Sequence, residues 1–369
     1  MKKIIHVHSD RKFISDSEKF NGEFFINELL ILETKNSFNE AYHNKALFFE
    51  PNPVNLNNIL AIVNSADILV LYNLDFFKSQ IVNCVDKKVK IIWRFFGTEL
   101  YSRKLHLYLS TKSKSYFIPR LFKDQVKRIL PFLFQNEISF YRAIKRSDAF
   151  VSVFKDEYKY LIKHWNHLPI FIRLSQDGLR LYSKEINFEL EYPKSNTVVI
   201  GNSRSQYNNH LDILESIATC DLDQNISIKL LFNYGPNNKY TQKVREKADC
   251  IANVTLIDSF ITSNEFIDFY GPVAAFVNNS FRQMALGNIF MALHRGVKVY
   301  LNKKNPTYPW LKNEGLYIYE IKDLKNDLET GHIHLTKSEI EHNLKCLKKL
   351  KEDYTKTDFQ LQVLELLNN

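Results

Sequence analysis

Residues 197–205 read Thr-Val-Val-Ile-Gly-Asn-Ser-Arg-Ser, and this stretch decides the predicted fold. Its first four residues are apolar or β-branched, which is typical of a short buried strand. A Gly-Asn-Ser turn follows the strand, and helical spacing of apolar residues begins near Tyr207. A strand, a glycine turn and a helix in this order predict an α/β unit with a parallel sheet.

The same alternation continues on both sides of this stretch. Towards the C-terminus, strands are predicted at Ser227–Phe232, Val254–Ile257, Ala274–Val277 and Lys298–Leu301, and helices at Tyr207–Ala218, Tyr240–Cys250, Glu265–Tyr270 and Gln283–His294. Towards the N-terminus, strands are predicted at Lys3–Val7, Ala46–Phe49, Ile68–Tyr72, Val89–Phe95, Ala149–Val153 and Ile170–Leu174, and helices at Asn55–Val63, Phe76–Val85 and within Leu121–Lys145.

A polar and charged stretch at residues 183–196, with Pro193 near its end, is the predicted linker. It separates an N-terminal domain at residues 1–190 from a C-terminal domain at residues 191–369, which ends in a lysine-rich helical stretch. Two successive α/β domains describe a GT-B-like fold, in which two Rossmann-like domains face each other across a cleft. Sugar epimerases, some phosphorylases and periplasmic binding proteins also have two such halves, so the fold alone does not give the function.

The composition is that of a folded globular protein, with 45% apolar and 25% charged residues in a chain of 369. The four cysteines form no Cys-x-x-Cys pair, so neither a zinc site nor a disulfide framework is expected. The N-terminal apolar run is too short and too polar for a signal peptide, and no stretch approaches the roughly 18 apolar residues of a spanning helix. We therefore expect a cytoplasmic protein whose contact with a membrane is peripheral.

The excess positive charge lies in one segment. The formal net charge is +9, and residues 101–147 hold eleven Lys/Arg and two Asp/Glu, whereas the rest of the chain has 39 of each sign. Nine aromatic residues lie in the same segment. Such a mixture fits an anionic surface, either phospholipid or nucleic acid. The alternative is a solvated basic helix packed by its aromatic residues.

Three loops of the C-terminal domain follow predicted strands and are the candidate binding loops. Ligands of such sheets bind beyond the carboxyl ends of the strands, and free N–H groups at a helix start suit a diphosphate. Arg282 is the strongest candidate, because a cation at a predicted helix start opposes the macrodipole unless an anion offsets it. Each loop has a structural alternative as a helix cap or an ordinary turn. The candidate residues are Gly201, Asn202, Ser203, Asn233, Tyr234, Tyr240, Arg282, Gln283, Gly287 and Asn288.

In the N-terminal domain, the candidate catalytic residues are Glu99 and Asp10. Glu99 follows a predicted strand in a Gly-Thr-Glu turn, where it could act as a general base, bind a substrate hydroxyl or cap the next helix. Asp10 lies just past the first strand, whereas His6 and His8 alternate along it and are expected to be packing residues rather than metal ligands.

The sequence contains few other recognisable motifs. Asp-Leu-Asp at residues 221–223 lies between a helix and a strand and is interpreted as a surface turn. No P-loop, zinc signature, Gly-x-Ser-x-Gly or EF-hand is present, and we expect no metal and no cofactor.

Together, these motifs resemble those of the TDP-N-acetylfucosamine:lipid II N-acetylfucosaminyltransferases, glycosyltransferase family 56, also called 4-alpha-L-fucosyltransferases. The matching stretches are Ile5-His6-Val7 with Ser9-Asp10, Trp93 with Gly97-Thr98-Glu99-Leu100-Tyr101, Gly201-Asn202-Ser203 with Asn209-His210, Gly235-Pro236-Asn237-Asn238 with Tyr240, Arg282-Gln283 with Gly287, and Gly296 through Asn305-Pro306 with Trp310. The enterobacterial members have Gly-Ala-Asp-Leu-Tyr where this chain has residues 97–101, and the basic aromatic segment is this chain's own in detail.

The resemblance implies a GT-B hexosyltransferase on the inner face of a bacterial inner membrane. It would move an N-acetylfucosamine-like deoxy-amino sugar from a nucleoside-diphosphate donor, TDP-linked in the family, to a polyprenyl-diphosphate-linked glycan in surface polysaccharide synthesis, as for enterobacterial common antigen. The C-terminal domain would bind the donor, the N-terminal domain the acceptor, and residues 101–147 would face the anionic membrane. The alternatives are a two-domain nucleotide-sugar epimerase, or a glycosyltransferase with another donor and acceptor. No motif supports a nucleic-acid partner.

Overall fold

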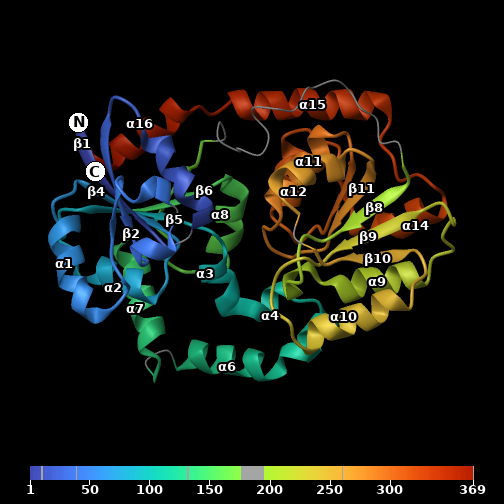
Figure 1. The fold of residues 1–369 in the computed structure, drawn as a ribbon, viewed down its shortest axis with the longest axis horizontal. Helices are drawn as coiled ribbons and strands as arrows, with labels where there is room; N and C mark the ends of the chain where they lie inside the picture. Colours follow the sequence, from blue (N-terminus) through green and yellow to red (C-terminus); the bar gives the residue numbers. More distant parts are fainter. Residues whose placement is uncertain (10, 39, 131–132, 176–194, 260, 369) are drawn as a thin grey trace. The chain divides into compact units, whose positions relative to one another are not determined.

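The computed structural model describes residues 1–9, 11–38, 40–130, 133–175, 195–259 and 261–368 (Figure 1). The chain forms two compact units, each built on its own parallel sheet. The first unit consists of Met1–Arg103, Gln125–Gly178 and Tyr354–Asn369, and the second of Lys104–Asp124 and Leu179–Asp353. The predicted division at 190/191 and most of the predicted linker fall in residues 176–194, outside the described residues.

The first unit holds a seven-stranded parallel sheet in the order β3-β2-β1-β4-β5-β6-β7. All five residues of β4 are buried, as expected for a parallel strand that is covered on both faces. The strands are β1 (Lys2–His8), β2 (Phe25–Ile31), β3 (Ala46–Phe48), β4 (Ile68–Tyr72), β5 (Lys90–Arg94), β6 (Ala149–Ser152) and β7 (Ile170–Arg173). The helical segments are η1 (Arg11–Phe20), η2 (Lys35–Ser37), η3 (Glu40–Tyr42), α1 (Pro53–Val63), α2 (Phe76–Cys84), α3 (Thr98–Tyr101), η4 (Ser102–Lys104), α7 (Gln135–Arg146), α8 (Lys155–Ile162) and α16 (Lys356–Asn368).

The second unit holds a six-stranded parallel sheet in the order β10-β9-β8-β11-β12-β13. Its strands are β8 (Thr197–Ile200), β9 (Ser227–Leu231), β10 (Val254–Ile257), β11 (Val273–Asn278), β12 (Lys298–Leu301) and β13 (Tyr319–Glu320). Its helical segments are α4 (Leu105–Tyr108), α5 (Thr111–Lys114), η5 (Ser115–Phe117), η7 (Gln206–Asn208), α9 (His210–Ala218), α10 (Lys239–Asp249), α11 (Ser263–Tyr270), α12 (Leu286–His294), α13 (Thr307–Asn313), η8 (Ile321–Asp323), α14 (Leu324–Glu329) and α15 (Lys337–Glu352). One division between the units falls within α6 (Ile118–Ile129), and another falls within η4, whose Lys104 belongs to the second unit.

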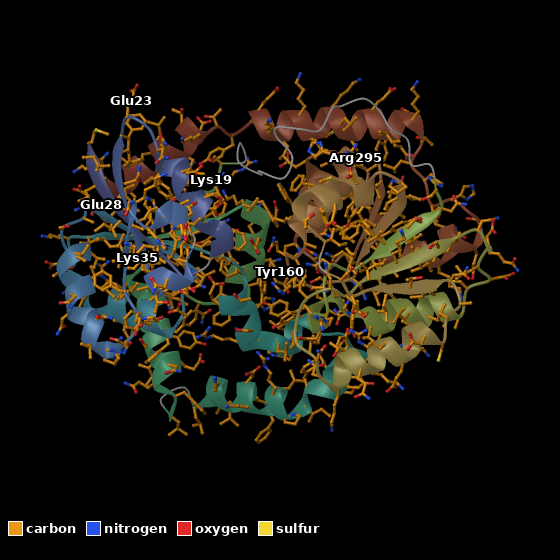
Figure 2. The ribbon with its side chains drawn as sticks, in the orientation of Figure 1. Lys19, Glu23, Glu28, Lys35, Tyr160 and Arg295 are labelled. Atoms are coloured by element: carbon orange, nitrogen blue, oxygen red, sulfur yellow. The ribbon has the colours of Figure 1, made fainter. Side chains whose placement is uncertain are left out.

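The last helix belongs to the first unit, which departs from the predicted domain at residues 191–369. The side chains of Phe359, Val363 and Leu366 in α16 join the apolar core of the first sheet. The Gln360 side chain donates to the backbone oxygen of Lys19, 2.9 Å away, in η1 (Lys19 is labelled in Figure 2). Apolar burial, rather than position along the chain, therefore assigns α16 to its unit.

Residues 104–124 belong to the second unit, whereas the prediction places them in the N-terminal domain. This part of the basic segment packs on the second unit, where the rings of Tyr116 and Phe117 contact Tyr240 at centroid distances of 5.9 Å. The backbone N–H of Ser110 donates to the Asn209 side chain at 2.8 Å. Part of the aromatic content of residues 101–147 is thus used for packing within the protein.

Most of the predicted strands and helices are confirmed, and β4, β8, β10 and β12 match their predicted ranges to the residue. Strand β2 was not predicted, because Asn27 and Glu28 interrupt its apolar run. The Asn27 side chain is nevertheless used inside the unit, since its oxygen lies 2.8 Å from the His6 ring. Two polar residues in the middle of β2 therefore prevented its prediction, although its other residues are apolar.

Candidate functional site

The loops that follow β8 and β9 meet at the carboxyl edge of the second sheet. The Asn202 side chain donates to the Tyr234 hydroxyl at 2.8 Å, and the backbone N–H of Arg204 donates to the Tyr234 carbonyl at 2.7 Å. Gly201 has φ +67°, and a Cβ there would lie 3.0 Å from the His210 ring, so a residue with a side chain would be strained at this position. Ser203 is buried beneath this contact, and Tyr234 stays half exposed at its surface.

Arg204 ties the same two loops together. Its guanidinium donates to the Asn237 side chain at 2.7 Å and to the Asn233 carbonyl at 3.3 Å. The side-chain oxygen of Asn233 is buried and has no hydrogen-bond partner among the described residues. A cationic group and an unsatisfied amide thus lie together at this edge of the sheet, as in a site built for a polar ligand.

The loop that follows β11 brings Arg282 to the same edge. The guanidinium carbon lies 4.4 Å from the centroid of the Tyr207 ring, and only 8% of the residue is exposed. Burial raises the pKa of Tyr207, and the positive charges of Arg282 and of Arg120 in α6 act against that rise. Arg282 acts in the same way on Tyr234, whose pKa burial also raises. Arg282 therefore lies near the loops that follow β8 and β9 within the second unit.

The predicted position of Arg282 at a helix start is wrong. The helix α12 begins at Leu286, after Ala285 in a left-handed conformation with φ 60°, so Arg282 and Gln283 belong to the preceding loop. The macrodipole argument for Arg282 consequently loses its basis. What remains is the contact between its guanidinium and a tyrosine ring on a neighbouring loop.

The remaining predicted donor-binding residues have other surroundings. Tyr240 is fully buried, and its hydroxyl accepts the His210 backbone N–H at 2.9 Å, so this ring belongs to the core and cannot stack on a ligand. Gly287 and Asn288 lie in the first turn of α12, and the Asn288 side chain donates to the Tyr270 hydroxyl at 3.1 Å.

The sequence does not predict a network of asparagines, of which Asn208, Asn209 and Asn279 are buried and Asn302 is partly buried. The Asn209 side chain donates to the Asn279 carbonyl at 3.1 Å, and the Asn302 side chain donates to the Asn279 side-chain oxygen at 2.7 Å. The side-chain oxygen of Asn208, also buried, has no hydrogen-bond partner among the described residues. These residues follow β8, β11 and β12, so asparagines clustered after strand ends were the available signal.

Glu99 is buried at the carboxyl edge of the first sheet. One of its oxygens accepts hydrogen bonds from the Trp93 indole and the Phe96 backbone, both at 3.2 Å. The other oxygen, Oε2, is buried without a hydrogen-bond partner among the described residues. Burial raises the pKa of Glu99 above its usual value of 4.5, and Lys78 acts against that rise. Such a carboxyl group has the environment of a general base.

The first strand supplies two histidines with different surroundings. Both His6 nitrogens are within hydrogen-bond distance of a partner, the Tyr72 hydroxyl at 3.0 Å and the Asn27 side chain at 2.8 Å, which fits the predicted packing role. His8 instead stacks on Tyr72 with ring centroids 3.7 Å apart. Asp10, the second predicted catalytic residue, lies outside the described residues.

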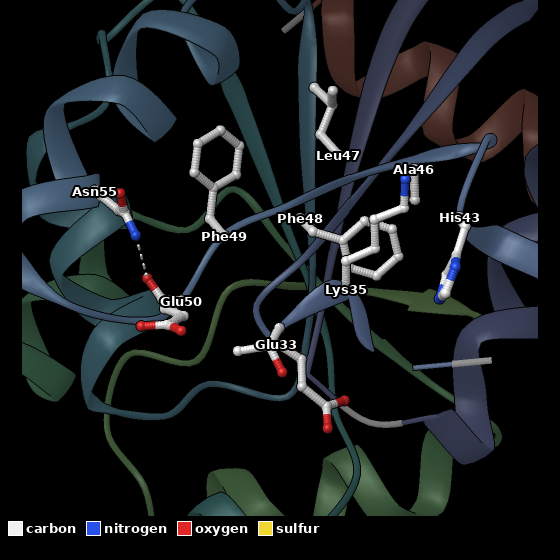
Figure 3. Close-up of a pocket in the computed structure, with 10 residues that line it drawn as sticks. Glu33, Lys35, His43, Ala46, Leu47, Phe48, Phe49, Glu50 and Asn55 are labelled. Atoms are coloured by element: carbon white, nitrogen blue, oxygen red, sulfur yellow. Dashed lines mark hydrogen bonds between the residues drawn. The ribbon is translucent and has the colours of Figure 1, made fainter. Parts of the chain in front are cut away.

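A cavity of about 630 Å³ opens at the carboxyl ends of β2 and β3 in the first unit (Figure 3). Its wall combines carboxylates with aromatic rings, and the Asn55 side chain donates to the Glu50 carbonyl at 3.0 Å. The lining residues are Glu33, Thr34, Lys35, His43, Ala46, Leu47, Phe48, Phe49, Glu50 and Asn55. Aromatic faces beside carboxylates and a lysine suit a hydroxyl-rich ligand.

No helix among the described residues is long and apolar enough to cross a membrane. The same residues contain no cluster of three or more His, Cys, Asp or Glu side chains placed to share a metal ion. The Asp221–Asp223 stretch has no regular structure and leads into a turn at residues 224–225, where the Asp223 carboxylate accepts the Asn225 N–H at 2.9 Å.

The chain is similar over nearly its whole length to solved glycosyltransferases. It is similar to Anabaena Alr3699/HepE, solved with UDP and glucose, at 10% identity and a TM-score of 0.64, with both chains fully covered. It is also similar to an alpha-glucosyltransferase solved with UDP, at 10% identity, a TM-score of 0.62 and full coverage of both chains. A glycosyltransferase from Rickettsia africae matches at 11% identity and a TM-score of 0.63, over 99% of this chain and 97% of that one.

The chain has the GT-B fold. The predicted fold class, with two parallel sheets of the Rossmann type, is thereby confirmed. No family model and no curated protein matches the sequence. The resemblance to glycosyltransferase family 56 therefore stays a prediction.

Proposed function

We propose that this protein is a glycosyltransferase that binds a nucleoside-diphosphate sugar at the carboxyl edge of its second sheet. The observation that carries the proposal is that Arg204 and Arg282, from loops after different strands, both lie near the half-exposed Tyr234. Guanidinium groups recognise phosphate oxygens in a two-pronged geometry. The similarity to glycosyltransferases solved with UDP supports the same assignment.

In the proposed reaction, the acceptor oxygen forms a bond to the anomeric carbon while the bond from that carbon to the diphosphate breaks. The electron pair of the broken bond leaves with the diphosphate, and the hydroxyl proton passes to a base in the first unit. Negative charge therefore grows on the diphosphate as the bond breaks. Arg282 and Arg204 would stabilise this charge more in the transition state than in the bound donor. We propose that these two cations do so without a metal ion.

The proposed acceptor is a polyprenyl-diphosphate-linked glycan that binds to the first unit. Glu99 would receive the hydroxyl proton, since its environment favours a base. The cavity beside Phe48 and Phe49 would receive the sugar rings of the glycan. The sequence resemblance adds the finer identity, an N-acetylfucosamine-like sugar carried by TDP.

The helix α6 supports the proposed contact with an anionic membrane. Ile118, Phe122 and Ile129 follow a helical spacing that puts them on one face, and each is more than 60% exposed. Arg120 and Lys123 lie between them along the helix. An exposed apolar stripe within a basic helix is the pattern of a helix that lies in a membrane surface. Each basic residue near anionic lipid adds about 1 kcal/mol of attraction.

The test of the donor site is a thermal-shift screen of nucleoside-diphosphate sugars, TDP- and UDP-linked. We expect at least one of them to raise the melting temperature with increasing concentration, because a ligand that binds only the folded state stabilises it. The shift should persist in EDTA if no metal takes part. A screen in which no nucleotide sugar raises the melting temperature would contradict the proposal.

Product analysis separates transfer from the epimerase alternative. An epimerase converts the nucleotide sugar without an acceptor, whereas a glycosyltransferase releases the nucleoside diphosphate only as it transfers or hydrolyses the sugar. A new nucleotide sugar formed from the donor alone would favour the epimerase.

A further inference from the structure

The His8 ring is fully buried, yet neither of its nitrogens has a hydrogen-bond partner among the described residues. His6, two residues earlier on the same face of β1, has a partner for each nitrogen. Buried polar groups are nearly always satisfied, and an unsatisfied one costs stability. Stacking on Tyr72 does not explain a histidine at position 8, because a phenylalanine would stack as well without the polar cost.

The surroundings of His8 point to the reacting edge of the first sheet. Lys78 is buried beside it and donates to Ser9 at 2.6 Å and to the Tyr72 carbonyl at 2.6 Å, which joins the ends of β1 and β4. The charge of Lys78 acts on both His8 and Glu99. Burial, together with His6 and Lys78, holds the pKa of His8 well below its usual value, so the ring is neutral at physiological pH.

Two unsatisfied groups therefore lie around one buried lysine at the same edge. His8 ends β1, Glu99 follows β5, and β4 lies between these strands. Two strand spacings amount to roughly 10 Å, and side chains that extend from both strand ends can shorten this separation. The neutral ring offers one donor and one acceptor, and the Glu99 oxygen Oε2 offers an acceptor.

We propose that His8 and Glu99 together bind the hydroxyl groups of one acceptor sugar, with His8 as a neutral hydrogen-bonding residue and Glu99 as the proton acceptor. This inference rests on the proposed function. The segment η1 packs over this edge through the Arg94–Asp16 ion pair at 2.9 Å and the contact of Phe13 with Phe96, so acceptor binding includes a displacement of η1.

The experiment compares His8→Phe with His6→Phe in the full-length protein. His8→Phe keeps the stack on Tyr72 and removes the unsatisfied nitrogens, so we expect a higher melting temperature than in the wild type. His6→Phe removes satisfied hydrogen bonds, so we expect a lower one. With a TDP-linked deoxy-amino sugar and a polyprenyl-diphosphate-linked disaccharide, His8→Phe should lower kcat/KM for the acceptor by on the order of tenfold to a hundredfold, whereas His6→Phe should change it little.

Three results would overturn the inference. One is a His8→Phe protein with wild-type kcat/KM for the acceptor. Another is a loss of the donor-induced thermal shift in His8→Phe alone, since His8 would then act on the fold or the donor. The third is a wild type without any donor-induced shift, which removes the proposed function and the inference with it. If His8→Phe is too unstable to assay, His8→Gln replaces it and should retain part of the activity, because its amide keeps a donor and an acceptor.

Discussion

At the scale of the single residue, Arg282 is the side chain on which the proposed transfer most depends. Its guanidinium is nearly buried against Tyr207, so water screens its charge poorly, and the charge would act strongly on the proposed diphosphate. We predict that Arg282→Ala lowers turnover at saturating donor by roughly a hundredfold, the effect of removing one stabilising group from a developing anion. The turnover of Arg282→Lys should lie between those of the wild type and Arg282→Ala, because lysine keeps the positive charge but lacks the planar guanidinium group.

The matched control is Lys325→Ala in the same unit. Lys325 is a surface cation whose ammonium group donates to the Thr219 carbonyl at 3.2 Å, after the end of α9 and away from the candidate site. Its loss should leave turnover unchanged. Wild-type turnover in Arg282→Ala would remove Arg282 from the mechanism, and an equal loss in both variants would indicate damage to the fold.

The raised pKa of Glu99 leads to a prediction about the pH dependence of activity. Burial raises its pKa above 4.5, so the carboxylate form, which is the proposed base, appears only as the pH passes this raised value. We predict that kcat/KM falls on the acid side at a pH above that expected for an ordinary glutamate, and that Glu99→Gln loses most of the activity and this acid limb.

The stability contributed by Glu99 should depend on pH in the opposite sense. A folded-state pKa above the unfolded value means that this contribution is complete below pH 4.5 and declines as the pH rises through the raised pKa. Melting temperatures of the wild type and Glu99→Gln, measured across the same pH range as the activity, test this. Parallel rather than opposed trends would contradict the assignment.

Single residues also set the limit of what the sequence predicts about the site. The strand-end loops of Gly201 and Tyr234 were predictable, because parallel strands put their carboxyl ends at one edge. The contact between Arg282 and Tyr207 was not, since it depends on side-chain packing between distant loops. Tyr240 was misplaced for the same reason, because the aromatic residues that cover it come from residues 104–124.

At the scale of the element, α6 carries the predicted membrane contact. Phe122 is 70% exposed, so its replacement leaves the core untouched. We predict that Phe122→Ser weakens binding to anionic vesicles by about tenfold to a hundredfold, since a Phe side chain loses roughly 1.5–3 kcal/mol when it is no longer buried in an apolar phase. Vesicle flotation with and without anionic lipid measures both the apolar and the charge-dependent part of the binding.

The control for this prediction is Val54→Ser on α1. Val54 is 82% exposed and has no basic residue within its own helix, so its loss should not change flotation. Equal recovery of the wild-type protein with neutral and anionic vesicles would count against the membrane contact. A salt-dependent gel shift with nucleic acid would instead favour the other anionic surface that the charge pattern allowed.

Elements also show why some of the fold was predictable and some was not. The strands β8, β10 and β12 are short apolar runs bounded by polar residues, so period and composition agree. The predicted start of α12 is three residues too early, because Ala285 adopts a left-handed conformation that an alanine does not predict.

At the scale of the whole molecule, the two units exchange segments, and no local pattern in the sequence marks this. Residues 104–124 interrupt the first unit and pack on the second, whereas α16 follows the second unit and packs on the first. The sequence predicts two successive domains because it records order along the chain. Assignment of a segment to a unit depends on which core buries its apolar face, and that is decided by tertiary packing.

This exchange predicts that α16 stabilises the first unit specifically. The Phe359 ring is fully buried and lies 5.0 Å from the Phe20 ring, so Phe359→Ala should cost about 3–5 kcal/mol of unfolding free energy. Leu361→Ala on the same helix is the control, since Leu361 is 45% exposed. Because α16 is not part of the second unit, the donor-induced thermal shift should survive in Phe359→Ala. Equal stability of the two variants in denaturant titrations, or loss of the donor response in Phe359→Ala alone, would mean that α16 does not serve the first unit in this way.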